Sequence, residues 1–263
     1  LMIRRPPRST LDRSSAASDV YKRQTLNRPK KRNALNGELI SALSDELNYA
    51  AEDEDVSVIA IMGSGKDFCA GADLAELERV TNLGHEASVA DAMTMGELFI
   101  QMRRHSKPII AIVHGRALAG GCGLATACDM VLARDDAEFG YPEINLGFVP
   151  AMVMAILLRK VTESVAFELV TTGEIISAQK SKKFGLVNRV FSTADFESGT
   201  SDFLNMIANK PGSALALSKE LLYRMEESVF EELIAKGAEV NAIARQTKEC
   251  RDGVRQFLDR SQG

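Results

Sequence analysis

Apolar residues along this chain alternate between helical spacing and short continuous runs. Between 36 and 51, Leu39, Leu43 and Leu47 recur on one helical face, and Asn36 can cap the helix. Four short runs rich in branched apolar residues predict buried strands: 56–62, 109–113, 129–133 and 187–191. Helical spacing predicts further helices over 86–102, 151–160, 163–171, 178–184 and most of 194–258. The alternation favours an α/β core followed by a helical C-terminal third.

The first 24 residues differ in composition from the rest. They contain six basic and two acidic residues and a Pro6-Pro7 pair. No apolar region follows the arginines, so a signal peptide is not indicated, and the weak periodicity predicts no strand. We therefore expect 1–24 to be a leader outside the family fold, either disordered or artefactual. We expect 25–193 to form the α/β core and 194–263 a separate helical region.

Length, charge and cysteine content exclude several classes of protein. The 263 residues suit one large domain, and a net charge of −4 with a pI near 5.6 disfavours a nucleic-acid binder. The longest apolar run, 151–158, is too short to insert into a membrane. The four cysteines form no C-x-x-C pair, so we expect reduced thiols and a cytoplasmic protein.

Glycine-rich turns follow two of the predicted strands, but they match no nucleotide-binding motif. In GSGKDF (63–68), Asp67 stands where a phosphate-binding loop needs Ser or Thr. Phe68 stands at the third glycine of the dinucleotide fingerprint. The sequence also contains no G-x-S-x-G and no H-E-x-x-H motif. We interpret His114, which directly follows a predicted strand, as structural.

Two segments of small residues, 68–74 and 115–125, lead into predicted helices. The first amide groups of a helix have no intrahelical partner and point outward. Two such amides that converge on one oxygen form an oxyanion hole, which stabilises the charge that develops on a thioester carbonyl. Small residues also permit tight turns and close helix–strand packing, so spacing alone leaves both interpretations open.

Five ordered segments resemble the enoyl-CoA hydratase/isomerase (crotonase) family: 26–36, 68–74, 110–130, 139–150 and 177–191. The resemblance implies a crotonase-like spiral of ββα units, with 194–263 as a helical trimerisation region. It also implies a homotrimer or a dimer of trimers that acts on an acyl-CoA thioester. No cofactor is expected, because coenzyme A is part of the substrate, and no metal, nucleic-acid partner or membrane insertion is expected.

The resemblance also assigns residues. Ala72 and Gly120 are the matched oxyanion-hole donors, through their backbone N–H groups. The residues matched to substrate binding are Lys30, Ala70, Gly71, Asp73, Leu74 and Gly121. Lys30, Lys31 or Arg32 would pair with the phosphates of coenzyme A, unless this segment is only a solvated basic turn.

The resemblance makes Glu143 the acid/base. Its apolar neighbours in sequence, Phe139, Tyr141, Ile144 and Leu146, predict a partly desolvated carboxyl with a raised pKa. Such a group could transfer protons near neutral pH.

The second glutamate that hydratases of this family use maps to Gly123, which has no carboxyl. Glu76, Glu78 and Glu97 are the nearest other acids in sequence, although each suits a solvated helix face. Three functions therefore stay open. Glu143 hydrates a 2-enoyl-CoA, or it acts as the single carboxylate of a 3-enoyl to 2-enoyl-CoA isomerase, or the chain is a silent acyl-CoA-binding or assembly subunit.

Overall fold

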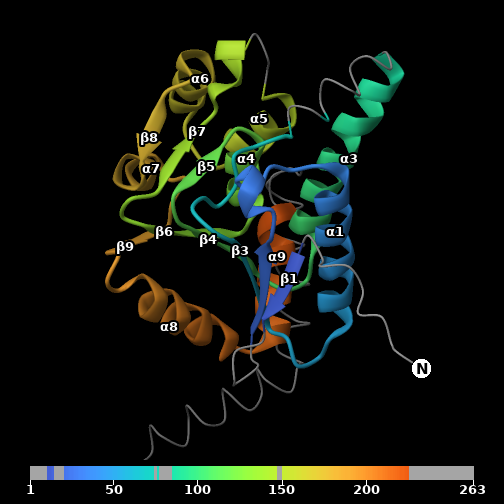
Figure 1. The fold of residues 1–263 in the computed structure, drawn as a ribbon. Coiled ribbons are helices and arrows are strands. Elements are labelled where there is room, and N and C mark those ends of the chain that lie inside the picture. The colour runs from blue at the N-terminus through green and yellow to red at the C-terminus, as the bar shows by residue number, and fades with distance from the viewer. Residues whose placement is uncertain (1–10, 15–20, 74–75, 77–84, 147–149, 225–263) are drawn as a thin grey trace, which may run out of the picture.

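Two β-sheets form the centre of the computed structural model, which describes residues 11–14, 21–73, 76, 85–146 and 150–224 (Figure 1). The larger sheet contains, in spatial order, β1 (Leu11–Ser14), β2 (Tyr21–Leu26), β3 (Val58–Gly63), β4 (Ile109–Val113), β6 (Met130–Arg134) and β9 (Arg189–Phe191). Its neighbouring strands are parallel except for β1 and β2. The smaller sheet contains β5 (Arg116–Leu118), β7 (Glu138–Gly140) and β8 (Ile175–Ser177).

Successive segments of the chain add one strand to each sheet and then a helix. β4 and β6 are parallel neighbours in the larger sheet, while β5 and β7, which follow them in sequence, are parallel neighbours in the smaller one. Two isolated parallel bridges, Leu35 with Ala72 and Cys69 with Ala117, extend the pairing of the smaller sheet to segments that come earlier in the chain. The predicted spiral of ββα units is therefore confirmed.

The helices follow the predicted apolar spacing closely. They are α1 (Gly37–Glu52), α3 (His85–Arg104), α4 (Gly120–Ala127), α5 (Ala151–Leu157), α6 (Glu163–Thr172), α7 (Ala178–Phe184), α8 (Phe196–Ala208) and α9 (Gly212–Arg224), with short 3₁₀ turns η1 (Pro29–Lys31) and η2 (Pro142–Leu146). The predicted cap is present, because the Leu39 amide donates to Asn36 Oδ1 at 3.1 Å.

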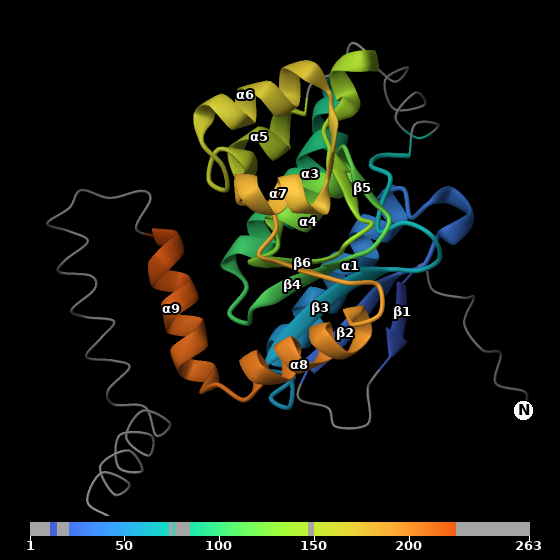
Figure 2. The same cartoon turned by 90° about the vertical axis from the view of Figure 1, so that its left-hand side faces the viewer.

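Apolar side chains cover both faces of the larger sheet, as its unbroken apolar strands predict. In β3, Ile59 and Ile61 belong to the core shared with α1, α3, α4 and the smaller sheet. Val58 and Ala60 point to the other face, where they pack with Phe203 of α8. Figure 2 shows α8 beneath the larger sheet and α4 to α7 above it.

The predicted leader boundary is wrong, because residues 21–24 belong to the sheet. β2 begins at Tyr21, and Tyr21, Gln24 and Leu26 are buried. The Gln24 amide donates to Glu46 Oε2 of α1 at 3.1 Å, which partly satisfies a buried polar side chain. All six residues of β2 also pair with β3, which begins only at Val58, so local composition does not reveal the strand. Residues 11–14 also form a strand, β1.

The predicted boundary at 193/194 does not separate two folding units, because α8 packs on the larger sheet. Within the predicted helical region, α8 and α9 are separated at Pro211, which disfavours helical backbone at the residue before it. Residues 225–263 lie outside the described part of the chain, so their predicted role in trimerisation stays a prediction. No helix among the described residues is long and apolar enough to cross a bilayer.

Candidate active site

The backbone amides of Ala72 and Gly120 lie next to each other where the two small-residue segments meet. A Cβ built on Gly120 would lie 3.8 Å from the Ala72 amide nitrogen and 4.0 Å from Gly71 Cα. Neither amide donates a hydrogen bond to any described residue. Two adjacent donors without a protein acceptor are the arrangement that an oxyanion hole requires.

The parallel bridge with Leu35 orients the Ala72 amide. Leu35 donates to the Gly71 carbonyl at 2.8 Å and accepts from the Asp73 amide at 2.8 Å. In such a bridge the residue between the two bonded positions points its own N–H to the opposite side. The Ala72 amide therefore points away from Leu35, and Ala72 itself is exposed to solvent.

A strained residue sets the direction of the Gly120 amide. Ala119, which precedes α4, has φ 51° and ψ −129°, a conformation that residues with a Cβ rarely adopt. Its amide donates to the Gly140 carbonyl at 2.8 Å, and its carbonyl accepts from the Gly123 amide at 3.0 Å. These bonds hold the turn, and Gly120 becomes the first residue of α4, whose amide has no intrahelical partner.

Gly71 allows the two loops to approach this closely. Its φ is 104°, and a Cβ there would lie 2.8 Å from Ala119 Cβ. The buried Asn33 side chain holds the turn that precedes segment 68–74. Its amide donates to the Ser64 carbonyl at 2.9 Å and to the Asp67 carbonyl at 2.8 Å. No sequence motif distinguishes Asn33 as functional, although it lies inside the matched segment 26–36.

Glu143 lies in η2, directly after the smaller sheet. Its Oε2 atom is buried and has no hydrogen-bond partner in the described part of the chain, and desolvation raises the pKa of the carboxyl. The strand that leads into η2 contacts α4, because the Ala119 amide donates to the Gly140 carbonyl at 2.8 Å and the Tyr141 hydroxyl lies 3.3 Å from Thr126 Oγ1. η2, which carries Glu143, therefore begins beside α4.

The surroundings of Glu143 agree only partly with the sequence. Phe139 and Tyr141 are fully buried and desolvate the loop. Ile144, predicted to help, is instead 43% exposed, because successive residues of the 3₁₀ turn face different directions. The side chain of Leu146 lies outside the described structure. The buried orphan oxygen is nevertheless an uncommon feature in a folded protein and marks Glu143 as a functional candidate.

Apolar side chains occupy the space beside Gly123, the position matched to a second carboxylate. A Cβ built there would lie 2.0 Å from Val153 Cγ1 of α5 and 3.5 Å from Phe99 Cζ of α3. Val153 and Phe99 are both buried. Neither residue could be identified from the sequence, because α3, α4 and α5 meet only in the folded chain. The described structure thus places a wall of apolar atoms beside the position that matches the second glutamate of the family's hydratases.

Two of the predicted substrate-binding residues, Gly121 and Ala70, already contact other backbone segments. A Cβ at Gly121 would lie 2.3 Å from the Cys69 carbonyl oxygen, so this position admits no side chain. The Ala70 amide donates to the Arg32 carbonyl at 3.0 Å. The carboxylate of Asp73 is held by Arg28 at 2.9 Å, which indicates a structural clamp. Leu74 lies outside the described residues.

Two of the three alternative acids lie among the described residues, and neither has surroundings that mark it as an acid/base. Glu76 accepts from the Gly37 amide at 3.0 Å, so it caps α1, while Glu97 is exposed. Glu78 lies outside the described residues.

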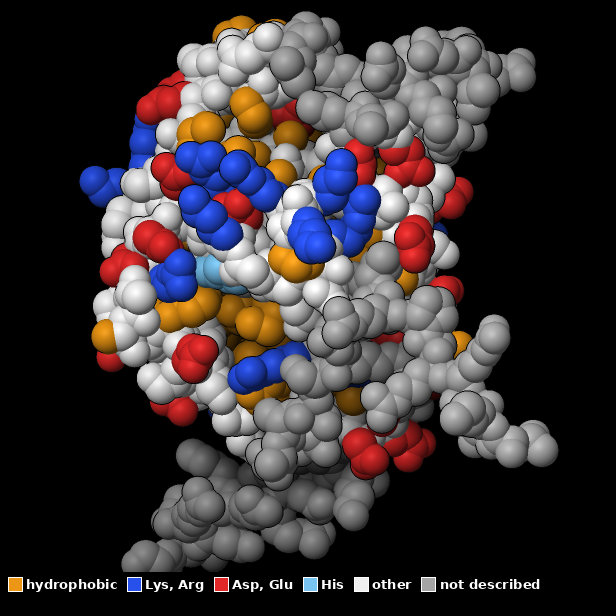
Figure 3. Space-filling view, in the orientation of Figure 1, with side chains coloured by type: hydrophobic (Ala, Val, Ile, Leu, Met, Phe, Trp, Pro, Cys, Tyr) orange, Lys and Arg blue, Asp and Glu red, His pale blue; other side chains and the backbone are white. Residues whose placement is uncertain are grey.

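The basic segment of η1 is available to an anionic ligand. Lys30 and Lys31 are exposed and, within the described structure, neither forms an ion pair. Arg32 lies 3.7 Å from Asp67 Oδ2. Figure 3 shows Lys and Arg side chains gathered across the middle of the molecular face that Figure 1 presents. A phosphate could reach Lys30 or Lys31 without displacing a described acid.

Three cysteines are structural thiols. Cys69, Cys122 and Cys128 are free and buried, and burial raises the pKa of Cys69 to about 12. A thiol with such a pKa is not a nucleophile at neutral pH. Cys250 lies outside the described structure, and the described residues contain no group of three or more potential metal ligands.

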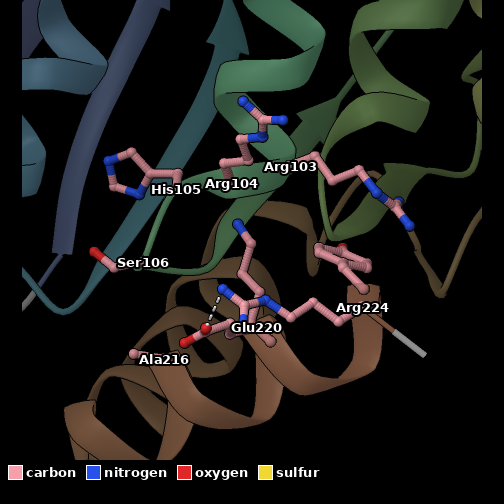
Figure 4. A pocket seen from close by; sticks show the side chains of 9 residues that line it. Arg103, Arg104, His105, Ser106, Ala216, Glu220 and Arg224 are labelled. Carbon is pink, nitrogen blue, oxygen red and sulfur yellow. Dashed lines mark ion pairs between the residues drawn. The ribbon is translucent and has the colours of Figure 1, made fainter. Parts of the chain in front are cut away.

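A basic hollow of about 580 Å³ between α3 and α9 is separate from these residues (Figure 4). At its base, Lys219 donates to Asp129 Oδ2 at 2.8 Å and to the Met102 and Lys107 carbonyls at 3.1 Å each. Arg224 is paired with Glu220 at 2.8 Å. Because the Lys219 and Arg224 charges already have partners, we interpret the hollow as the seam that fixes α9 to the core.

The fold and the paired amides define a crotonase-type α/β protein. The family model for enoyl-CoA hydratase/isomerase matches residues 21–263. The 2,3-dehydroadipyl-CoA hydratase of Escherichia coli is 36% identical over 239 residues, which cover 90% of this chain and 91% of that protein. The chain belongs to the enoyl-CoA hydratase/isomerase family and is an enzyme of that type.

Other relatives agree with this assignment. The mouse mitochondrial enoyl-CoA hydratase domain-containing protein 3 is 32% identical over 249 residues, which cover 94% of this chain and 82% of that protein. The crystal structure of an enoyl-CoA hydratase from Mycobacterium smegmatis superposes with a TM-score of 0.90 at 33% identity, covering 95% of this chain and 96% of that one.

Proposed function

We propose that the protein hydrates a 2-enoyl-CoA thioester, with Glu143 as both base and acid. The observation that carries the proposal is the adjacency of the Ala72 and Gly120 amides. The Glu143 carboxyl supports it, because its Oε2 atom is buried and has no hydrogen-bond partner among the described residues. The name of the Escherichia coli relative, a 2,3-dehydroadipyl-CoA hydratase, supports hydration over other reactions of the family.

The proton balance needs only one carboxylate. The Glu143 carboxylate takes a proton from water while the water oxygen bonds to the β-carbon. The electron pair of the carbon–carbon double bond moves towards the thioester, whose oxygen becomes negative and accepts hydrogen bonds from the Ala72 and Gly120 amides. Glu143 then returns its proton to the α-carbon. The product is a 3-hydroxyacyl-CoA, and the carboxylate is regenerated. The raised pKa of Glu143 suits both halves of this cycle.

Isomerisation is the second candidate, and the apolar wall beside Gly123 favours it. Glu143 would take a proton from the α-carbon of a 3-enoyl-CoA and return it to the γ-carbon, which gives the 2-enoyl isomer. That reaction uses no water, so Val153 and Phe99 would not hinder it. The oxyanion hole would have the same role in both reactions.

Three further expectations belong to the proposal. The exposed Lys30 or Lys31 would bind the phosphates of coenzyme A. Assembly as a homotrimer or a dimer of trimers and a cytoplasmic location follow only from the resemblance and the cysteine content. Light scattering of the purified protein tests the assembly.

Steady-state turnover of crotonyl-CoA and of 3-hexenoyl-CoA tests the proposal. In Glu143→Gln we expect turnover of the preferred substrate to fall by about 100-fold or more, because general acid–base catalysis is worth roughly 10²–10⁴ in rate. Affinity for coenzyme A, measured by calorimetry, should stay unchanged. Glu52→Gln, at an exposed position that ends α1, is the matched control and should keep full activity.

Each result decides between the candidates. Faster turnover of crotonyl-CoA supports hydration, and faster turnover of 3-hexenoyl-CoA supports isomerisation. Binding of acyl-CoA without turnover of either substrate at any pH would show a silent binding subunit and would refute the proposal.

A further inference from the structure

Gly123 and Val153 compete for one volume. A Cβ on Gly123 would lie 2.0 Å from Val153 Cγ1 and 3.2 Å from Val153 Cβ, and separations under 3 Å do not occur between such atoms. Val153 is 5% exposed and β-branched, so packing and its restricted χ1 rotation oppose movement. A side chain at position 123 and a valine at position 153 therefore exclude each other.

The shared volume adjoins the candidate oxyanion hole. Residues 120 and 123 are three positions apart in α4 and so lie on one helix face. The Cα–Cβ bond of a helical residue tilts towards the helix N-terminus, which here is the Gly120 end. Val153, which occupies the Cβ position of residue 123, therefore lies on the Gly120 side of α4, with Phe99 of α3 beside it.

Glu143 follows a segment that contacts the same helix, since the Gly140 carbonyl accepts from the Ala119 amide at 2.8 Å and the Tyr141 hydroxyl lies 3.3 Å from Thr126 Oγ1. The buried Glu143 Oε2 atom in η2 and the Val153–Phe99 wall are therefore both candidates to line the site of a thioester oxygen bound by Gly120. The wall offers no group that could hold a water molecule.

We propose that Val153 and the side-chain-free position 123 act together as a specificity determinant: Val153 fills the space that an acid at 123 would need, and the pair thereby sets the ratio of hydration to isomerisation. The Val153 side chain keeps the Gly123 side of the acyl site apolar, so that every proton transfer passes through Glu143. This inference rests on the proposed function. Val153→Gly combined with Gly123→Glu should remove part of the apolar wall and place a second carboxyl in the space that Val153 now fills.

Four variants test the shared volume by thermal unfolding, which requires no activity. Gly123→Ala alone should lower Tm by more than 5 °C, because its methyl group meets Val153. In the background of Val153→Gly the same change should cost much less, since the space is then free. Gly212→Ala, at a position with nothing within 4 Å of the added Cβ, is the matched control and should not lower Tm. Equal costs of Gly123→Ala in both backgrounds would overturn the inference.

Turnover then tests the chemical consequence. For Gly123→Glu with Val153→Gly, we expect the ratio of crotonyl-CoA hydration to 3-hexenoyl-CoA isomerisation to rise at least tenfold above wild type. Val153→Gly alone supplies space but no acid, so its ratio should change less than threefold.

Two negative results have different meanings. A folded, active double variant with an unchanged ratio would overturn the inference and leave the proposed function intact. A wild-type protein that turns over neither substrate would refute the proposed function, and the assignment of Val153 would fail with it.

Discussion

A single methyl group on Gly120 should separate catalysis from folding. The Cβ of Gly120→Ala would lie 3.8 Å from the Ala72 amide nitrogen, 3.8 Å from Leu35 Cδ1 and 4.0 Å from Gly71 Cα. These are ordinary van der Waals distances, and Gly120 does not have a left-handed φ. The substitution therefore introduces no clash and no backbone strain, and the variant should fold as the wild type does.

The same methyl group should impair catalysis, because it stands beside the gap between the two amides. An oxygen that accepts from both amides would meet the methyl group and move away from at least one donor. Loss of one oxyanion-hole donor typically lowers kcat by about 10²–10³, or roughly 3–4 kcal/mol. Substrate affinity should change less, because the charge on the oxygen develops mainly in the transition state.

The assay combines steady-state kinetics with thermal denaturation. For Gly120→Ala we expect kcat to fall about 100-fold or more and Tm to stay within about 2 °C of wild type. Gly212→Ala, the same substitution in α9 with open space around it, should change neither quantity. A Gly120→Ala enzyme with kcat within threefold of wild type would refute the assignment of this amide. A large fall in Tm would show that the packing argument is wrong.

Two further predictions concern buried charges. Because the pKa of Glu143 is raised in the folded state, the wild-type protein loses stability as pH rises through that pKa. The Tm of Glu143→Gln should therefore rise relative to the Tm of wild type between pH 4 and pH 8. A Tm difference between the two proteins that stays constant over this range would contradict the raised pKa. Lys219→Met should lower the free energy of unfolding in urea by about 3–5 kcal/mol, because it leaves the largely buried Asp129 carboxylate without its ion pair. The double variant with Asp129→Asn should recover most of this stability. A loss below about 1 kcal/mol in the single variant would show that the pair is not important for stability.

Elements with local signals were predictable from the sequence. α7 has its predicted bounds, because Ser177 caps it and Gly185, with φ 95°, ends it. α1 begins after Asn36 for the same kind of reason. The unbroken apolar run of β4 predicted a strand buried on both faces. Capping and apolar patterning act within a few residues, so the sequence displays them directly.

Features that depend on distant contacts were not predictable. β2 depends on its pairing with the distant strand β3, and the apolar wall depends on Val153 and Phe99 meeting Gly123. The strained backbone of Ala119 has no signal in its residue type, since alanine is not expected at positive φ. The positions of Ala72 and Gly120 came from family resemblance, because backbone donors leave no side-chain signature. The family resemblance also identified Glu143, but only the structure shows that its Oε2 atom is buried without a described hydrogen-bond partner.

A crystal structure of the enzyme with a bound acyl-CoA would show whether the two amides form an oxyanion hole. We expect a thioester oxygen within about 3.2 Å of both the Ala72 and Gly120 amide nitrogens, a normal hydrogen-bond distance, with the Glu143 carboxyl facing the α-carbon. A thioester oxygen bound elsewhere, or a Glu143 carboxyl turned away from the acyl group, would contradict this expectation.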